Sequence, residues 1–415
     1  MKKKYLYFQP QYVDEFKCDG AKCNARCCKN WNVFIDKKTY RQYEQIKPEA
    51  DSAEILSHMT FHDERKEHLV TMTDEGTCPF LNENKLCRLQ LKYGEEFLSV
   101  TCSSFPRRSL NFGKFFERSL VMTCPVAAEM ILFNEEPIKF EFVEVSEKVH
   151  SNGGKIGIAP VYTTEGFEEY MLEIQIAMIS ILQERTLALD QRLIVLGFFL
   201  DRLDELTSNK NVTLAELDEL IDALKKLIAA YESKSFLAQQ VPRMLATIQF
   251  DAKKFISLML EFLESLYGEL QLDKDKTPLL LLAKTLGIVP DAHGQVSVVK
   301  VTVNYRRLAD KRKDFFARRA TFFENYLVNE LFMNGFPWRH EASIAKNFGV
   351  FVATYKLFEL LAFAAEQQNF TSKEDLLALT DWFLSSIDHN EQFIKKFLES
   401  VSDDLLVTME TLLQS

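Results

Sequence analysis

The sequence predicts a mainly α-helical protein, with a small Cys-rich metal-binding α+β module at the N-terminal end followed by a larger α-helical domain. All eight cysteines of the 415-residue chain lie between Cys18 and Cys124. Further along, apolar residues recur every three or four positions, which is the period of an amphipathic helix. Glycine is scarce, with 14 residues, which argues against a loop-rich all-β fold. We expect a Cys-rich metal module over 1–130, a linker with a short strand over 131–164, and the helical domain over 165–415.

The N-terminal module is expected to contain short strands and modest helices. Strand candidates cover residues 31–35, 69–72 and 118–122. His58 and His62 are four residues apart in a highly charged stretch, which favours an exposed helix face over a metal site. Because structural metal binding contributes directly to folding, this module is expected to owe much of its stability to a bound metal.

The linker is indicated by turn-forming residues on either side of a strand expected over 140–145. Within it, Gly153-Gly154-x-x-Gly157 is the nearest approach to the Gly-rich loop of a Rossmann fold. Pro160 would interrupt the helix that must follow such a loop, so a plain linker is the favoured interpretation.

Amphipathic helices are expected through the C-terminal domain. An apolar stripe runs over 167–181, and Thr213-x-x-Glu216 and Thr371-x-x-Glu374 are capping boxes that open two further helices. Other helical stretches cover roughly 187–206, 252–270, 305–333 and 341–367. One interruption is expected over 290–303, where a loop is followed by alternating valines.

Charge and hydropathy narrow the function classes. Residues 1–130 carry a net charge of +2 and the rest of the chain −12, so nucleic acid is not expected as a partner. The longest apolar run, 193–200, is far too short to cross a bilayer, and no signal peptide follows the basic start. We therefore expect a cytoplasmic protein without a transmembrane segment; the sequence does not predict its oligomeric state.

The cysteines indicate a metal site. In a reducing compartment, clustered thiols point to metal binding or catalysis and not to disulfides. Zinc sites commonly use Cys-x-x-Cys pairs, which are absent, whereas iron–sulfur clusters are held by thiolates, often with proline after a ligand, as in Cys78-Pro79 and Cys124-Pro125. Spacing alone favours iron–sulfur modestly over zinc. The metal-ligand candidates are Cys18, Cys23, Cys27, Cys28, Cys78, Cys87, Cys102 and Cys124.

Several sequence blocks resemble known families. Cys23-x3-Cys27-Cys28, Cys78-Pro79-Phe80-Leu81 with Cys87, and Cys102-x-x-Phe105-Pro106 resemble the Cys-rich iron- or zinc-chelating domain family. Further blocks look like the flagellin lysine N-methylases: Phe16-Lys17-Cys18, Cys28-Lys29-Asn30-Trp31, Gly94-Glu95-Glu96-Phe97-Leu98, Glu117-Arg118-Ser119-Leu120, Thr123-Cys124-Pro125, and Glu324-Asn325-Tyr326-Leu327-Val328-Asn329. The resemblance implies a bacterial protein-lysine N-methyltransferase that moves a methyl group from S-adenosylmethionine to flagellin lysines and carries an iron–sulfur cluster, expected to have four irons.

Candidate site residues follow from this activity. A lysine ammonium must lose its proton before its nitrogen can attack, so a base is required. Glu324 and Tyr326 are the catalytic candidates, because they stand among aromatic residues that suit a lysine stem and a methylsulfonium. Arg107 and Arg108 are candidates for the cofactor's carboxylate. No Rossmann pattern and no Cys-x3-Cys-x-x-Cys loop is present, so S-adenosylmethionine is expected to bind outside a Rossmann fold, and radical and polar methyl transfer both stay open.

An alternative function of a different class is compatible with the same cysteines. The chain could be a non-catalytic zinc- or iron-binding module that docks a partner or delivers metal. Iron with acid-labile sulfide favours the enzyme, whereas stoichiometric zinc favours the module. A redox sensor based on Cys27 and Cys28 is a weaker third hypothesis.

Overall fold

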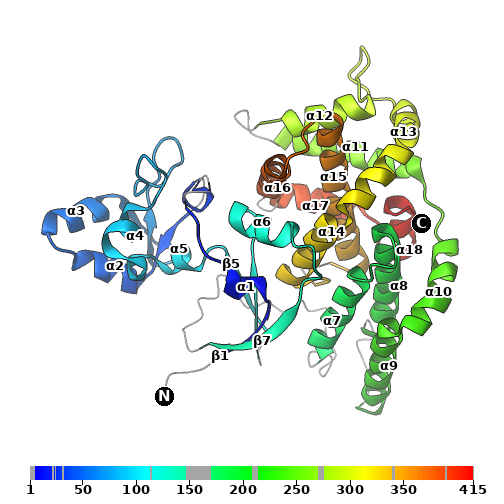
Figure 1. Ribbon diagram of the computed structural model, residues 1–415, viewed down its shortest axis with the longest axis horizontal. Helices are drawn as coiled ribbons and strands as arrows, with labels where there is room; N and C mark the ends of the chain where they lie inside the picture. The colour runs from blue at the N-terminus through cyan, green and yellow to red at the C-terminus, as the bar shows by residue number, and fades with distance from the viewer. Residues whose placement is uncertain are drawn as a thin grey trace. The chain divides into compact units, whose positions relative to one another are not determined.

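The computed structural model describes residues 5–20, 23, 25–29, 32–112, 115–145, 170–207, 214–269, 275–338, 342–387 and 390–414. Among these residues the fold is mainly α-helical, as predicted (Figure 1). The described residues form two compact units. Unit 1 holds those up to Ile131 and from Lys139 to Val145, and unit 2 holds Leu132–Ile138 and the rest.

Unit 1 contains a four-stranded sheet in the order β5-β6-β1-β7. The strands are β1 (Tyr5–Pro10), β5 (Arg107–Asn111), β6 (Phe116–Leu120) and β7 (Phe140–Val145). β1 runs parallel to β6 and antiparallel to β7, with Tyr5 opposite Val145 and Pro10 opposite Phe140. The strand predicted within the linker therefore exists, and it completes the sheet of unit 1. The strand predicted at 118–122 begins two residues earlier, at Phe116.

A second part of unit 1 combines a small sheet with short helices. Its sheet has the order β2-β4-β3, formed by β2 (Phe34–Ile35), β4 (Glu67–Val70) and β3 (Met59–His62). The helices of unit 1 are α1 (Tyr12–Glu15), α2 (Lys37–Glu44), α3 (Glu49–Ser57), α4 (Arg88–Tyr93), α5 (Val100–Ser104) and α6 (Pro125–Leu132). The expectation that His58 and His62 share a helix face was wrong, because α3 ends before His58 and His62 lies in β3. Trp31, in the strand predicted at 31–35, lies outside the described residues.

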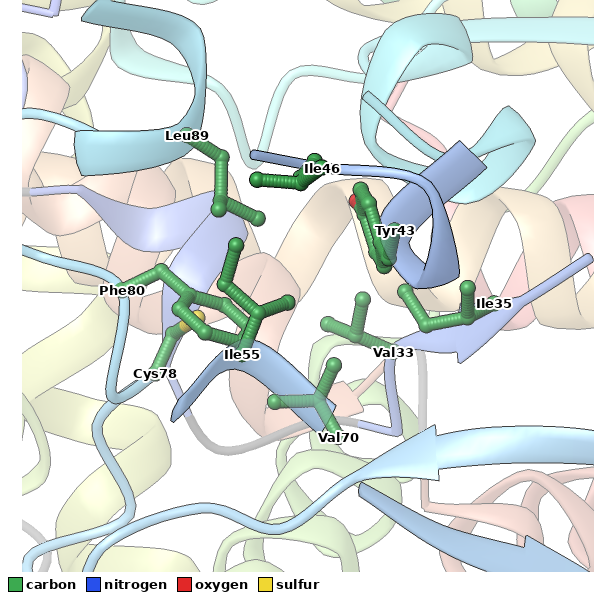
Figure 2. Close-up of a cluster of buried hydrophobic side chains, with 9 residues drawn as sticks. All are labelled: Val33, Ile35, Tyr43, Ile46, Ile55, Val70, Cys78, Phe80 and Leu89. Atoms are coloured by element: carbon green, nitrogen blue, oxygen red, sulfur yellow. The ribbon is translucent and has the colours of Figure 1, made fainter. Parts of the chain in front are cut away.

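One hydrophobic cluster holds this second part together. Its nine buried members are Val33, Ile35, Tyr43, Ile46, Ile55, Val70, Cys78, Phe80 and Leu89 (Figure 2). They come from loops, from β2 and β4, and from three short helices, none of which could bury an apolar face alone. The Tyr43 hydroxyl donates to the carbonyl of Phe97 over 2.7 Å, so the one phenol among the nine members has a hydrogen-bond partner. A cysteine in such a core places a thiol where water has little access.

The regular elements described in unit 2 are all α-helices. Its helices are α7 (Met171–Leu182), α8 (Leu189–Thr207), α9 (Leu214–Glu232), α10 (Lys234–Thr247), α11 (Ala252–Glu269), α12 (Thr277–Leu286), α13 (Val298–Arg307), α14 (Ala309–Met333), α15 (Ile344–Gln367), α16 (Lys373–Ile387), α17 (Glu391–Ser400) and α18 (Leu405–Leu412). α15 lies at its centre and packs against α8, α12, α14, α16, α17 and α18. Within the described part of the chain, α15 alone is long and apolar enough to cross a membrane, but 89% of its apolar window is buried inside the fold, as in a core helix.

Two local predictions in unit 2 need correction. The capping box of α16 is not Thr371-x-x-Glu374 but the overlapping Ser372-x-x-Asp375, where the side chain of each residue accepts the other's backbone N–H at 3.0 Å. The stretch 290–303 is not irregular throughout, because α13 begins at Val298 with Ser297 as its N-cap. Thr213, Phe167 and the Gly153–Gly157 loop lie outside the described residues.

Candidate functional site

Five cysteines of unit 1 gather at the hydrophobic cluster or beside it. Cys78 is a buried member, and Cys28, Cys87 and Cys102 pack against it, half-buried. Cys27 lies beside them, with its Sγ 3.7 Å from the Sγ of Cys28. We call Cys27, Cys28, Cys78, Cys87 and Cys102 the core thiol group. Figure 2 shows the sulfur of Cys78 beside the side chains of Phe80 and Ile55, so this thiol lies within the hydrophobic cluster.

The backbone next to two of these cysteines influences their thiol pKa values. Burial raises the pKa of Cys87, the N-cap of α4, and the backbone N–H groups of Gln90 and Leu89 offset part of that rise. Contact with Cys28 and, to a smaller extent, the backbone N–H of Phe80 lower the pKa of Cys78. N–H groups at a helix start favour a thiolate over a thiol, which is the form that ligates a metal. The N–H groups that follow Cys78 and Cys87 therefore act toward the thiolate form, although the pKa of Cys87 stays raised overall.

Burial raises the pKa of these thiols, whereas contact with Cys28 lowers the pKa of its two partners, Cys27 and Cys78. The hydrogen bond with Cys28 lowers the pKa of Cys27 to about 7 and also lowers that of Cys78. Cys28 retains the shared proton, and its own pKa is raised. Burial raises the pKa of Cys87, and that of Cys102 to about 12. Several buried thiolates cannot coexist without a compensating positive charge, which a metal would provide.

The other three cysteines form a second group. Burial raises the pKa of Cys124, and the nearby Cys23 and Cys18 raise it further, to about 11. Cys124 directly precedes α6, and the backbone N–H groups of Ala127 and Val126 offset part of this rise. Burial and, after it, the charge of Cys27 raise the pKa of Cys18. The second group therefore interacts electrostatically with the core thiol group. Of the six cysteines in the blocks that resemble the chelating-domain family, Cys23 lies in this second group and the other five form the core thiol group.

The donor set fits an iron–sulfur cluster in chemistry. The core thiol group consists of sulfur ligands in an apolar setting, which is how proteins hold such clusters. Within the described residues, however, no three Cys, His, Asp or Glu side chains surround one point as ligands of a single metal ion do. Metal binding and the identity of the metal therefore remain predictions. A bound cluster would have to draw the thiols apart from direct contacts such as that between Cys27 and Cys28.

Metal removal is expected to act on unit 1 selectively. Chelation or air oxidation should unfold residues 1–130 and leave the helices of unit 2 largely intact, because buried thiols lose the charge that holds them together. Limited proteolysis with mass spectrometry of the fragments should place new cuts in the first third of the chain, while the far-ultraviolet circular dichroism changes little. Cuts spread evenly along both units would contradict this expectation.

Arg107 and Arg108 begin β5 and point to opposite faces of the sheet, so they cannot grip one carboxylate together from the same side. The Arg107 guanidinium lies 5.1 Å from the ring centroid of Phe16 and donates to the Phe16 carbonyl over 3.3 Å. Arg107 is thereby held near the start of the Cys-rich segment that follows Phe16. The predicted cofactor role of the two arginines stays a prediction.

Glu324 of α14 lies in a buried ion triad. Its side chain is 1% exposed, and both carboxylate oxygens accept from Arg185 over 2.9–3.1 Å. Oε2 also accepts from Nη1 of Arg192 over 2.6 Å. Two guanidinium groups thus surround this carboxylate and join α14 to α8 and to the loop after α7. These contacts explain Glu324 as a structural residue; a catalytic role for it stays a prediction without support from this geometry.

Tyr326 lines a cavity at the C-terminal half of α14. The cavity has a volume of about 40 Å³ and is walled by α14, α15, α16 and α17 and by the turn after α14. We call it the α14 cavity. Its lining residues are Tyr326, Glu330, Asn334, Phe336, Asn347, Val350, Phe351, Thr354, Phe383, Leu384, Ile387 and Ile394. Tyr326 packs on Phe358 with ring centroids 4.9 Å apart, so its ring is fixed in the wall.

A larger and more polar groove lies elsewhere in unit 2. It has a volume of about 520 Å³ and is formed by α11, α17, α18 and the turn between the last two. Lys253, Lys254 and Glu261 line it together with several hydroxyl groups. Asp251 caps α11 at one end by accepting the N–H groups of both lysines. The groove contains none of the residues predicted to be functional.

Comparison with known proteins assigns the family. Residues 175–414, more than half of the chain, match the family model of the FliB lysine N-methylase C-terminal domain. The chain belongs to the FliB lysine N-methylase family. The match covers most of unit 2, including α14 and the α14 cavity. It makes lysine methylation the activity class and confirms the family that the sequence blocks indicated.

Relatives of this FliB-family chain extend the similarity to unit 1. A lysine-N-methylase of Salmonella choleraesuis (strain SC-B67) is 24% identical over 412 residues, covering 96% of both chains. A lysine-N-methylase of Salmonella typhimurium (strain LT2) is also 24% identical, over 407 residues, with the same coverage. The flagellar biosynthetic protein FliU of Salmonella muenchen is 32% identical over 127 residues, which are 30% of this chain and 75% of FliU. No solved structure matches the chain.

Sequence reasoning about the FliB-family site missed three polar residues of the α14 cavity: Glu330, Asn334 and Asn347. Glu330 and Asn334 follow Tyr326 in steps of four. Tyr326 and Glu330 therefore share one face of α14, and the C-cap residue Asn334 continues it. The Nδ2 of Asn334 donates to Oε2 of Glu330 over 2.9 Å. The four-residue spacing of these polar residues was visible in the sequence. It did not stand out, because every residue from Phe322 to Met333 is buried and this part of the helix has no exposed polar face that would mark a buried polar residue as unusual.

Proposed function

We propose that the chain catalyses S-adenosylmethionine-dependent N-methylation of lysine ε-amino groups of flagellin in the cytoplasm, and that a Cys-bound iron–sulfur cluster is required. The main observation in support is that relatives named lysine-N-methylase align along 96% of the chain, through both units. The flagellar name of the relative that aligns with 127 residues supports flagellin as the protein substrate. The −12 charge beyond residue 130 gives no support to nucleic acid as a partner.

The reaction needs a neutral amine. A lysine ammonium with a pKa of about 10.4 is almost fully protonated at neutral pH, so it first gives a proton to a base. The nitrogen lone pair then attacks the methyl carbon, and the carbon–sulfur bond breaks with its electron pair going to sulfur. The products are a methylated ammonium, a neutral thioether and the proton taken by the base. This polar course uses no redox step, and it is the course we propose.

The residues of unit 1 would hold the cluster. We assign its ligands to the core thiol group, which has the shared apolar setting that such a cluster needs. When bound, a cluster would supply a compact charged centre that joins the segments carrying Cys27–Cys28, Cys78–Cys87 and Cys102. Because the proposed methyl transfer is polar, it does not require electrons from the cluster.

The experiment that tests this function begins with elemental analysis of the full-length, anaerobically purified protein. Iron and acid-labile sulfide in a ratio near one are expected. The same protein, incubated with purified flagellin and methyl-labelled S-adenosylmethionine, should transfer label to flagellin. Stoichiometric zinc with no transfer would contradict the proposal and favour a metal-binding interaction module.

A further inference from the structure

Helix α13 presents a face that combines basic and apolar side chains. Val299, Val303 and Arg307 follow one another in steps of four, so they form one row along the helix. Lys300 and Arg306 lie on the two flanks of this row. All five side chains are exposed, whereas the other side of α13 is buried and packs on α11. We call Val299, Lys300, Val303, Arg306 and Arg307 the α13 face.

The valines of the α13 face are open to water. Val299 is 60% exposed and Val303 is 48% exposed. A third valine, Val289, is 74% exposed and precedes Pro290, which forms a β-bridge with Val296 just before α13 begins. Exposed apolar residues that occur singly are normal on a protein surface. Two on one helical row, with a third near the start of the helix, form a strip of apolar surface.

The charge of the α13 face is opposite to that of the sequence around it. Residues 298–313 contain six basic residues and one acidic residue, whereas the chain beyond residue 130 carries a net charge of −12. Within the part of the chain that the structure describes, the side chains of Lys300, Arg306 and Arg307 form no ion pair. An acidic region thus leaves three of its cations without a carboxylate, and these cations are available to carboxylates from outside.

Other arginines nearby show that pairing is possible in this part of unit 2. Arg318 and Arg319 of α14, the helix that follows α13, both pair with Glu366 of α15. The α13 face therefore differs from the next basic pair along the chain, whose charge is already compensated within the fold.

The combination of groups on the α13 face narrows the class of partner. A phosphate backbone would satisfy the cations, but it offers no apolar side chain to cover the valines, and the acidic remainder of the chain repels a long polyanion. Helices that enter a membrane surface typically carry Trp, Phe or Leu on the apolar side, whereas the apolar residues of this face are valines. A protein segment that carries carboxylates and an apolar side chain matches both features.

We propose that the α13 face docks an acidic segment of the protein substrate, with carboxylates at Lys300, Arg306 and Arg307 and an apolar side chain on the two valines. The identification of this partner as flagellin rests on the proposed function. A lysine ammonium has the same charge as the face and is repelled by it. The docked segment and the methylated lysine are therefore different parts of the substrate, and the face contributes affinity without taking part in the chemistry.

The test compares two double variants of the full-length protein, each of which removes two exposed positive charges. Arg306→Gln/Arg307→Gln changes the α13 face, and the control Lys225→Gln/Lys226→Gln changes α9. At low ionic strength, calorimetry should show that the face variant binds purified flagellin roughly three- to tenfold more weakly than wild type, because exposed ion pairs are lost. The control should match wild type. The difference should shrink in about 1 M salt, which screens exposed charges.

Steady-state kinetics separates docking from chemistry. In methyl-transfer assays, Arg306→Gln/Arg307→Gln should raise the KM for flagellin by about the same factor and leave kcat unchanged, since a docking contact stabilises the bound substrate and the transition state equally.

A second face variant tests the apolar strip. Val299→Ser/Val303→Ser keeps every charge and changes only exposed side chains, so helical circular dichroism and the denaturation midpoint should stay close to those of wild type. Its affinity for flagellin should fall about threefold or more at low salt and at about 1 M salt alike, because salt does not screen the burial of apolar surface.

The outcomes separate the docking face from the proposed function. Unchanged flagellin affinity and KM in both face variants, with wild type active, would overturn the docking face and leave the proposed function intact. Weaker flagellin binding by both face variants, with a wild type that transfers no methyl group, would support the docking face and overturn the proposed function. A wild type that does not bind flagellin would overturn both. If the face variants lost binding to phosphatidylglycerol vesicles and kept flagellin binding, the partner would be a membrane surface and the proposal wrong.

Discussion

Glu324→Ala is expected to lower the free energy of unfolding by about 3–5 kcal/mol, because it leaves two arginines without the carboxylate that they share. Arg192 is 4% exposed and cannot turn to water. It keeps contacts with the carbonyls of Leu182 and Leu187, but these do not neutralise its charge. Chemical denaturation followed by circular dichroism of the helices should show the loss as a lower midpoint with an unchanged slope.

A double variant separates charge from packing. Glu324→Met combined with Arg192→Met removes the buried charges together, and it should recover much of the stability lost in Glu324→Ala, since Arg185 is about one-third exposed and can be hydrated. Equal stability of wild type and Glu324→Ala would contradict the structural account of Glu324. A Glu324 variant that keeps its midpoint but loses methyl transfer would restore Glu324 as a catalytic candidate.

Serine replacement in the core thiol group is expected to abolish iron and sulfide binding and, with it, methyl transfer. Cys78→Ser should have the largest effect, because this residue is a buried member of the cluster and its sulfur contacts Cys28. A serine hydroxyl is a much poorer ligand for iron than a thiolate. Iron and sulfide analysis after anaerobic reconstitution should therefore give colourless protein for Cys78, Cys87 and Cys102.

The second group of cysteines provides the matched comparison. Cys124→Ser changes an equally buried thiol that directly precedes a helix, but outside the core thiol group. It should retain more iron than Cys78→Ser. If all eight single serine variants kept full iron and sulfide, the cluster proposal would be refuted. Loss of iron in Cys18, Cys23 and Cys124 variants alone would move the ligands to the second group.

The fold class was predictable because helix formation leaves a local signature. α8, α11 and α15 begin and end within three residues of the predicted stretches, since their apolar spacing is set by the buried side alone. The stretch 305–333 was predicted as one helix, but the chain breaks at Leu308 into α13 and α14. The valines that open α13 alternate as in a strand, and the helix forms because Val301 and Tyr305 are buried against neighbours that the sequence does not reveal.

The candidate site was less predictable, because its partners come from distant segments. The grouping of Cys28 with Cys78 depends on a backbone contact between the two residues, 50 positions apart. Glu324 and Glu330 lie on the same helix and are both buried, yet one meets arginines across 132–139 residues of sequence and the other faces a cavity. No local pattern separates these two environments, so only the tertiary structure could distinguish the carboxylate of the ion triad from the one that lines a cavity.

The central claim is methyl transfer to lysine nitrogen, and peptide mass spectrometry of flagellin tests it most directly. Flagellin is incubated with the anaerobically reconstituted chain and S-adenosylmethionine carrying a trideuterated methyl group, and then digested and sequenced. Our account predicts that lysine ε-amino groups gain methyl groups that retain all three deuterium atoms. Flagellin lysines without added methyl groups, from a preparation with full iron and sulfide, would contradict it.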